Sequence, residues 1–151
     1  MFDEQNIFFN LEGKQQNEIL KALSRIAAEL GVTEKPKRIY KNYLKREKES
    51  TTGFGNGIAI PHAKSKSILK PTIIFARSQN KIDWNSLDEE PVNNYISILV
   101  PEKDSKTHLN LLAELSRNLV YDDFINTLKN GSKDEVYHLI EKAIGVIQNN
   151  L

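Results

Sequence analysis

The chain has 151 residues, of which 39% are hydrophobic and 27% are charged, a balance typical of a soluble globular protein with one core. Its 21 basic and 20 acidic residues give a formal charge of +1. A bulk attraction to nucleic acid or to an anionic membrane is therefore not expected, although a local basic patch is allowed. The chain has no cysteine, which excludes disulfide scaffolds, thiolate metal sites and cysteine nucleophiles.

The sequence also bears on where the protein works. Its first residues lack the basic region and apolar run of a secretory signal. No apolar stretch approaches the roughly 18 residues that span a bilayer. We therefore expect a cytoplasmic protein, and the length predicts a single domain over residues 1–151.

A strand and a helix open the chain. Residues 7–11 alternate apolar side chains and predict a short strand. From Ile19 to Leu30, apolar residues recur at helical spacing, and Gly31 is typical of a helix end.

A second helix is expected from a cap at Thr33 to about Lys48. Arg46 lies three residues after Tyr43 and seven after Ile39, so it shares the packed face of this helix near its C-terminal end. It is either a solvated surface arginine, which is the usual case, or an arginine that packing aims into the following loop.

The most distinctive stretch is residues 52–62, which read TGFGNGIAIPH. Glycine serves where φ is positive or where another group approaches the backbone. Residues 58–60 predict a buried strand whose two isoleucines would share a face with His62. Because Pro61 ends the ladder, His62 is expected where strand gives way to loop, a position that favours function.

Two further buried strands are predicted, at residues 72–76 and 95–100. The continuous apolar run of the first indicates a strand covered on both faces. Residues 64–70 before it are basic and polar. Residues 81–88 are a polar turn region whose tryptophan, Trp84, is expected to cover the core.

The helix that follows is expected to begin at a cap on Ser105 or Thr107 and to bury a leucine stripe from Leu111 to Leu119. His108 falls on this stripe in the first helical turn, above the positive end of the helix. That field disfavours the imidazolium, so we expect a neutral ring that donates a hydrogen bond, at a place that favours a bound anion.

Two helices complete the chain. Asp122 is expected to cap the first, which Gly131 closes, and Ser132 with Glu135 has capping-box spacing for the second. His138 lies on the far side of the last helix, so we expect it to be exposed and uninvolved in a site.

Three side chains at element ends need an explanation: His62, His108 and Arg46. They can be ordinary surface or cap residues, because isolated histidines often have no catalytic role. A zinc hydrolase is disfavoured because the histidines lack metal-ligand spacing, a serine hydrolase because GxSxG is absent, and a nucleotide site because the glycines precede a strand. Phosphoryl transfer fits better, with one histidine as nucleophile and the other two side chains binding the phosphoryl oxygens without a metal.

Arg46-Glu47 and residues 50–62 together resemble the signature of the mannitol/fructose-type enzyme IIA of the bacterial sugar phosphotransferase system, the type-2 IIA domain. Other segments are similar to further parts of that family: His108-Leu109 with residues 112–117, Asp83-Trp84 and Pro91-Val92. The similarity runs from about residue 7 to residue 143, and the stretch that ends in His62 is its most specific part.

This resemblance implies an α/β domain with a single mixed β-sheet flanked by α-helices and a core at about residues 7–143. It implies that His62 accepts a phosphoryl group from the phosphorylated histidine carrier protein and passes it to a cysteine of the cognate IIB component. His108 would donate a hydrogen bond to that group and Arg46 would stabilise its charge, with no cofactor and no metal. The membrane would be reached only through the IIB and IIC components of the transporter.

Some positions refine the resemblance. The residue six before the phosphorylated histidine is acidic in some mannitol members and is Asn56 here, which points to the fructose-like branch. Gly55 and Gly57 are expected to support the site together with Asn56. An apolar rim for protein partners is expected at Phe54 and Leu109, with a core position as the alternative for Phe54.

Two functions stay open at this point. The first is a phosphocarrier for sugar transport. The second is a regulatory protein like the nitrogen-related branch of the same family, whose phosphorylation state would tune its binding to other proteins. Both would use His62, Arg46 and His108, and a metal hydrolase is a third, more remote candidate.

Overall fold

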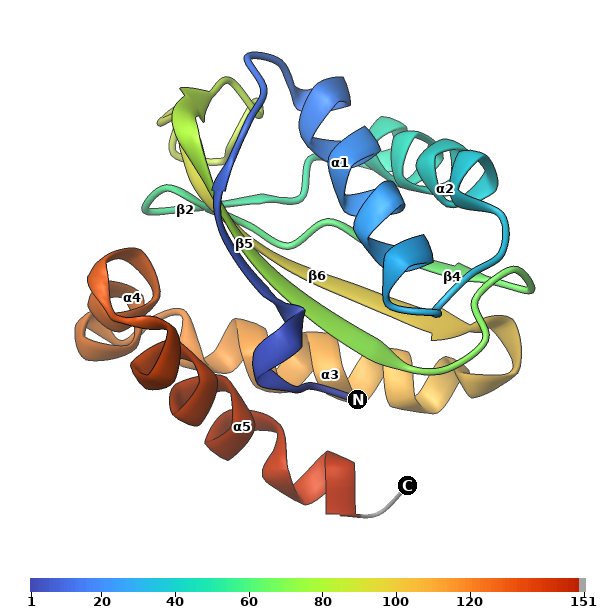
Figure 1. Cartoon of the computed structure of the whole chain (residues 1–151). Coiled ribbons are helices and arrows are strands. Elements are labelled where there is room, and N and C mark those ends of the chain that lie inside the picture. Colours follow the sequence, from blue (N-terminus) through green and yellow to red (C-terminus); the bar gives the residue numbers. More distant parts are fainter. Residues whose placement is uncertain (150–151) are drawn as a thin grey trace.

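The chain folds into one mixed β-sheet between two layers of helices, which a computed structural model describes for residues 1–149 (Figure 1). Within these residues, six strands lie in the order β1-β5-β6-β3-β2, and β4 also pairs with β6. Their bounds are β1 Ile7–Leu11, β2 Gly53–Gly55, β3 Ile58–Ala59, β4 His62–Ser65, β5 Thr72–Ile82 and β6 Val92–Pro101. The predicted α/β class with a single mixed sheet is confirmed.

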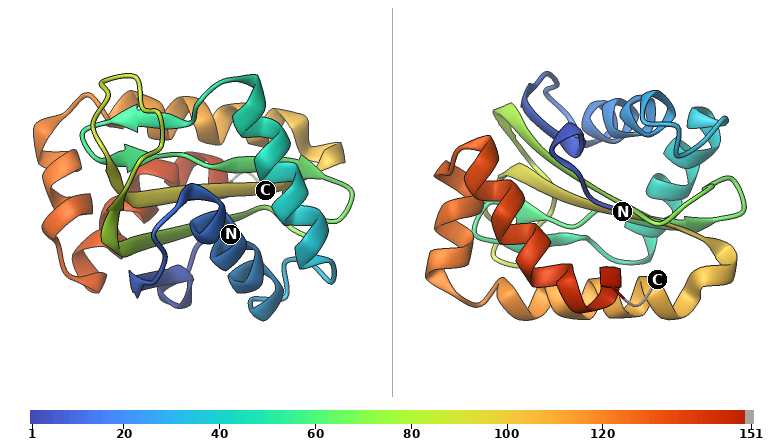
Figure 2. Two further views of the ribbon diagram at one scale, coloured as in Figure 1. Left: turned by 90° about the horizontal axis from the view of Figure 1, so that it is seen from above. Right: turned by 60° about the horizontal axis from the view of Figure 1, so that its bottom comes forward.

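Helices cover both faces of the sheet (Figures 1 and 2). One face is covered by α1 Gln16–Glu29 and α2 Pro36–Glu49. The other face is covered by α3 Ser105–Asn118, α4 Asp122–Asn130 and α5 Lys133–Asn149. Two short 3-10 helices, η1 Glu4–Asn6 and η2 Glu102–Asp104, lead into β1 and α3.

The two longest strands, β5 and β6, form the centre of the sheet and pair antiparallel. β1 joins the free edge of β5 in parallel. β3 and β4 follow one another along the other edge of β6, also in parallel, so β4 lies at the rim of the sheet. Because helices lie on both faces, the central strands are apolar on both sides, which explains their continuous hydrophobic runs.

Two hydrophobic cores lie on opposite sides of the sheet. We call the core under α1 and α2 the upper core and the core against α3, α4 and α5 the lower core, as they lie in Figure 1. Neighbouring residues of β5 alternate between them, with Ile74 in the upper core and Ile73 and Phe75 in the lower core. Trp84 is 1% exposed and packs in the upper core, as predicted.

β5 and β6 are both longer than the sequence predicts. β5 continues past residue 76 to Ile82, and β6 begins at Val92 rather than at residue 95. The two extensions pair with each other across a register shift, which lies between Arg77 and Ile82 of β5. Residues 79–81 are exposed and polar, so no apolar pattern in the sequence marks them as a strand.

The glycine segment forms a β-hairpin that the sequence prediction missed. β2 and β3 pair antiparallel and are joined by Asn56 and Gly57, whose φ angles are 57° and 80°. Two positive φ angles characterise a type I′ turn, for which Asn-Gly is a preferred sequence. The strand predicted at residues 58–60 accordingly ends at Ala59.

The predicted N-cap of the second helix, Thr33, is wrong. α2 begins at Pro36, and Thr33 lies before it with its Oγ1 accepting a hydrogen bond from the backbone N–H of Lys35 at 2.9 Å. Proline has no N–H to satisfy and a φ that suits the first helical position, so it starts the helix without a side-chain cap.

The predicted N-caps of α3 and α4 are also wrong, because each helix begins at or before the residue predicted to cap it. Ser105 is already the first residue of α3, which continues from η2, so neither Ser105 nor Thr107 is its cap. Asp122 is the first residue of α4 rather than its cap. The capping box before α5 is confirmed: Glu135 accepts from Ser132 N at 3.0 Å, and Ser132 accepts from Glu135 N at 3.2 Å.

Among residues 1–149, no helix combines the length and the apolar character needed to cross a bilayer. The single domain expected from the length reaches residue 151, and residues 150–151 lie outside the described part of the chain.

Candidate functional site

A cavity of about 390 Å³ opens at the rim of the sheet beside β4. It brings together the three side chains that the sequence singled out: His62 from β4, Arg46 from α2 and His108 from α3. Its other lining residues are Asn42, Lys45, Glu49, Ala63 and Lys64. Since α2 and α3 cover opposite faces of the sheet (Figure 1), side chains from both helical layers line the cavity.

His62 is the first residue of β4, so it begins a strand rather than leaving one as predicted. Its register partner on β6 is Ile98, which faces the lower core, so the His62 ring points to the α3 side of the sheet. Ile58 and Ile60 also face the lower core, in agreement with the predicted alternation. The His62 residue is 7% exposed, and its surroundings therefore fix its orientation.

The hydrogen bonds of His62 define its tautomer. Nδ1 lies 2.7 Å from the carbonyl oxygen of Ile60, and since a carbonyl oxygen can only accept, Nδ1 carries the proton. Nε2 therefore keeps its lone pair and accepts a hydrogen bond from Nε–H of Arg46 at 3.0 Å. Nε2 is the ring nitrogen that can attack an electrophile placed in the cavity.

Arg46 is positioned by contacts at the C-terminal end of α2. Its Nη1 donates to the carbonyl oxygen of Ser50 at 2.7 Å, and its Nε lies 3.8 Å from a carboxylate oxygen of Glu49. Only 27% of the side chain is exposed. This geometry supports the second interpretation of Arg46, in which packing directs the side chain towards the segment after α2.

His108 approaches His62 from the other layer. The two ring centroids are 5.2 Å apart and the ring planes are inclined by 60°. Nε2 of His108 is buried and has no hydrogen-bond partner among the described residues. Buried polar atoms are nearly always paired, so this unpaired nitrogen beside a cavity is available to bond a group that enters it.

The environment favours the neutral form of both rings. Burial lowers the pKa of His62 below its ordinary value; the hydrogen bond to the Ile60 carbonyl opposes this effect and the charge of Arg46 adds to it. Burial lowers the pKa of His108 to about 4, with further contributions from His62, Lys64 and Arg46. The lowered pKa of His108 agrees with the expected neutral ring, and its main cause is burial rather than the helix end.

Glu47, the residue after Arg46, fastens the glycine segment to α2. Its carboxylate accepts hydrogen bonds from the backbone N–H of Thr52 at 3.1 Å, from the Thr52 hydroxyl, and from Nε1 of Trp84 at 3.3 Å. Nε1 of Trp84 also donates to Oγ1 of Thr52 at 3.0 Å. This network fixes the turn from α2 into β2 and so the path of the chain towards His62.

Residues 1–143 match the protein family described as the phosphoenolpyruvate-dependent sugar phosphotransferase system, EIIA 2. The chain belongs to this EIIA 2 family. The resemblance carried by Arg46-Glu47 and residues 50–62 is thereby confirmed, and the protein is an EIIA phosphocarrier, a phosphotransferase component of that system.

Two curated relatives share about a third of their aligned residues with the chain. It is 33% identical to the fructose-like EIIA component of Escherichia coli K12 over 138 residues, 91% of this chain and 93% of that protein. It is also 33% identical to a nitrogen regulatory protein of Klebsiella oxytoca over 127 residues, 82% of this chain and 77% of that protein. The similarity to the fructose-like component agrees with the branch that Asn56 indicated.

A solved EIIA structure shows the same fold. The complex of enzyme IIAMTL with phosphorylated enzyme IIBMTL from Escherichia coli contains a chain that superposes with a TM-score of 0.78. The match covers 94% of this chain and 99% of that chain at 22% sequence identity.

The residues expected to support the EIIA site lie outside the cavity. Asn56, Gly55 and Gly57 belong to the β2–β3 hairpin, and none of the three lines the cavity of His62. Phe54 is half-buried against the lower core, which favours its core interpretation, whereas Leu109 is 66% exposed.

His138 is placed as predicted. Its side chain is 64% exposed, lies 3.3 Å from the Asp134 carboxylate, and does not line the cavity of His62.

Among the cavity residues that the sequence analysis of this EIIA chain did not single out, three carry side-chain hydrogen-bond donors. Asn42 lies one helical turn before Arg46 on α2, and its buried Nδ2 has no hydrogen-bond partner among the described residues. Lys45 and Lys64 add positive charge, and Lys64 Nζ donates to Oγ of Ser105 at 3.0 Å. Asn42 and Arg46 are four residues apart and so share one side of α2, but polar residues on a solvent-facing side show the same spacing, so the sequence does not single out Asn42.

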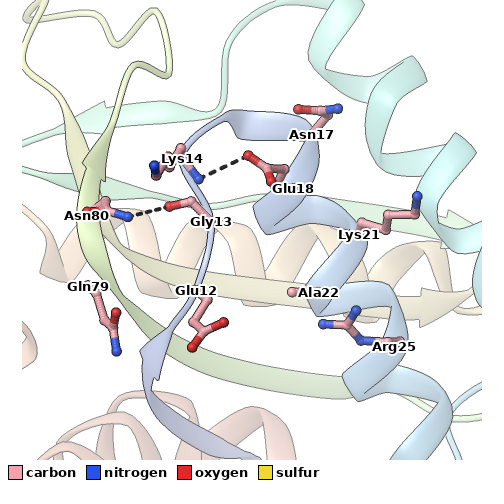
Figure 3. Close-up of a pocket in the computed structure, with 10 residues that line it drawn as sticks. All are labelled: Glu12, Gly13, Lys14, Asn17, Glu18, Lys21, Ala22, Arg25, Gln79 and Asn80. Atoms are coloured by element: carbon pink, nitrogen blue, oxygen red, sulfur yellow. Dashed lines mark hydrogen bonds between the residues drawn. The ribbon is translucent and has the colours of Figure 1, made fainter.

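A second hollow, of about 730 Å³, lies between the end of β1, α1 and the end of β5 (Figure 3). Its charged side chains are of both signs: Lys14, Lys21, Arg25, Glu12 and Glu18. Its polar groups also bond one another, as Asn80 Nδ2 does with the Gly13 carbonyl at 2.8 Å. Because the lining of this hollow includes no histidine and its three basic and two acidic side chains nearly balance, the cavity of His62 is the better candidate for the EIIA reaction.

Proposed function

We propose that this EIIA protein accepts a phosphoryl group on Nε2 of His62 from the phosphorylated histidine carrier protein and passes it to a cysteine of a IIB component. The observation that supports this most directly is the tautomer of His62. The Ile60 carbonyl holds the proton on Nδ1, so the lone pair of Nε2 is directed into a cavity that Arg46 and His108 share.

The transfer step is a displacement at phosphorus. The Nε2 lone pair forms a P–N bond to His62 while the P–N bond to the carrier breaks and its electron pair returns to the carrier nitrogen. In the second step a cysteine thiolate of the partner forms a P–S bond and the electron pair of the P–N bond returns to Nε2. The Ile60 carbonyl stabilises the partial positive charge that the His62 ring acquires while it carries phosphate.

The phosphoryl oxygens need donors, and the cavity supplies them. Arg46 Nε–H gives up its bond to Nε2 of His62 and turns its planar guanidinium to the oxygens. His108 Nε2 and Asn42 Nδ2 have no other partners among the described residues, so they are free to donate to the same oxygens. The low pKa of His108 keeps it neutral, and it therefore donates without repelling Arg46.

The test uses phosphoenolpyruvate, enzyme I and the histidine carrier protein, with intact mass as the measurement. We expect one acid-labile phosphate on the wild-type chain, none on His62→Gln, and full labelling of His138→Gln, which removes an exposed histidine outside the cavity. An unlabelled wild type, or equal labelling of His62→Gln, would disprove the mechanism. His108→Ala is expected to accept phosphate but to transfer it poorly to IIB.

A regulatory role is the alternative, and the similarity to a nitrogen regulatory protein favours considering it. In that role the same phosphate on His62 would alter binding to a regulated protein, without onward transfer to a cysteine. The two functions separate when the phosphorylated chain is mixed with the IIB components of its own organism. Loss of phosphate to a IIB cysteine supports transport, and retention with every IIB supports regulation.

A further inference from the structure

The charges of the chain are divided unevenly along the sequence. Residues 34–70 hold ten basic and three acidic side chains, a net of +7. The remaining 11 basic and 17 acidic side chains make −6, and together the two parts give the formal +1 of the whole chain. The near-neutral total therefore hides a strongly positive segment, and this segment contains both α2 and His62.

The positive charge is on the outside of α2. We call Lys37, Arg38, Lys41 and Lys45 the cationic α2 face; all four are exposed. No carboxylate among the described residues lies within 4.0 Å of their charged nitrogens. The Glu47 carboxylate hydrogen-bonds Thr52 and Trp84 and makes no ion pair with this face.

The cationic α2 face continues into the His62 cavity. Lys35, Lys37, Arg38, Lys41 and Asn42 line a hollow of about 500 Å³. Asn42 also lines the cavity of His62, so the hollow and the cavity are neighbours along α2. Lys45 and Lys64 lie within the cavity itself. A molecule that approaches His62 along α2 therefore passes basic side chains all the way from the hollow to the His62 ring.

We infer that the cationic α2 face is a docking surface for an acidic patch on the protein that exchanges phosphate with His62. The inference rests on the proposed function, because only then must a second protein bring its reactive side chain to this cavity. Charge complementarity gives the sign of the partner, and the exposed side chain of Leu109, next to His108, offers the apolar contact that a protein interface uses.

The charge that moves with the phosphoryl group strengthens the argument. A phosphoryl group carries about −1.5 to −2 charge near neutral pH. In the step from the histidine carrier, this charge is on the partner before transfer and adds to its attraction to the cationic α2 face. After transfer it neutralises part of the positive charge around His62, so the attraction within the product pair is weaker and the two proteins separate more readily.

The test compares two double variants with the same change in net charge. Lys37→Glu/Lys41→Glu reverses two charges on the cationic α2 face, and Lys21→Glu/Lys142→Glu reverses two exposed lysines on α1 and α5. The measurement is the second-order rate of phosphoryl transfer from the phosphorylated histidine carrier and to IIB, both from the same organism, between about 50 and about 500 mM salt.

We expect the α2 double variant to transfer at least about tenfold more slowly at low salt, with the difference shrinking at high salt, while the control stays within about threefold of wild type. Equal rates for both double variants, or an equal loss in both, would overturn the inference. Circular dichroism checks folding, which is expected because Lys37 and Lys41 are both exposed and a carboxylate at position 37, in the first turn, suits a helix.

Two further outcomes distinguish a failure of the docking surface from a failure of the proposed function. If wild type acquires phosphate on His62 at saturating carrier but the α2 double variant is not slowed, the docking surface is wrong and the proposed function stands. If wild type acquires none, both fail. A duplex RNA oligonucleotide titrated in parallel tests the other polyanion: its binding at physiological salt, together with unslowed transfer, would assign the face to nucleic acid instead.

Discussion

Asn42 lines the proposed phosphoryl site but lies outside the segments that resemble the family signature. Its Nδ2 is buried, borders the same cavity as Arg46 and His108, and has no partner among the described residues. We expect Asn42→Ala to slow transfer to and from His62 by about tenfold, because one charge-assisted hydrogen bond to the phosphoryl oxygens is lost. Asn42→Asp should slow it more, since a carboxylate repels the phosphoryl group. Rapid-quench kinetics measure both.

Asn126→Ala, an exposed asparagine on α4, serves as the matched control and should transfer at the wild-type rate. Wild-type transfer by Asn42→Asp would show that the amide does not contact the phosphoryl group.

At the scale of single residues, the sequence predicts those site residues that belong to a motif or share the packed face of a helix. His62 follows a distinctive stretch, and Arg46 and His108 share packed faces of their helices, so all three could be brought together by prediction. Lys64 and Asn42 could not, because a polar residue that enters a cavity has the same sequence signature as one that faces solvent. Their placement depends on where the β4 edge lies between two helices.

At the scale of elements, β2 is held against the loop after Trp84 at a position where only glycine fits. A Cβ on Gly53 would lie 2.8 Å from Cα of Ser86, and the Gly53 carbonyl accepts from the N–H of Leu87 at 3.3 Å. We expect Gly53→Ala to lower the free energy of unfolding by about 1–3 kcal/mol, because the backbone of the loop must move. Urea titration measures the change.

Gly145 in α5 gives the opposite expectation and serves as the control. A Cβ there meets no atom within 4 Å, so Gly145→Ala should raise the free energy of unfolding by up to about 1 kcal/mol through helix propensity alone. An unchanged Gly53→Ala protein, or a destabilised Gly145→Ala protein, would contradict this account.

Element type proved easier to predict than element boundaries. The long apolar stripes of α1, α3 and α5 define these helices, and the capping box of Ser132 and Glu135 stands where predicted. The three wrong caps share a cause: Thr33, Ser105 and Asp122 are polar residues near a helix start, and local composition does not fix which residue enters the helix. The Asn56-Gly57 hairpin was readable from its dipeptide alone.

At the scale of the whole molecule, the upper and lower cores share one sheet and should unfold together. Trp84, the only tryptophan, reports on the upper core, whereas Leu115 on α3 is fully buried in the lower core. We expect Leu115→Ala to cost about 2–5 kcal/mol. The Trp84 fluorescence transition in urea should shift by the same amount as the circular dichroism transition. A fluorescence transition that stays in place would show that the two cores unfold separately.

The position of the cavity at the rim of the sheet has a consequence for how phosphorylation is sensed. Under the proposed function, one phosphate on His62 is bound by Arg46 from the α2 layer and by His108 from the α3 layer. Its arrival therefore pulls on two helices that cover opposite sides of the molecule. A protein that binds only one of those sides would therefore still sense whether Nε2 of His62 carries phosphate.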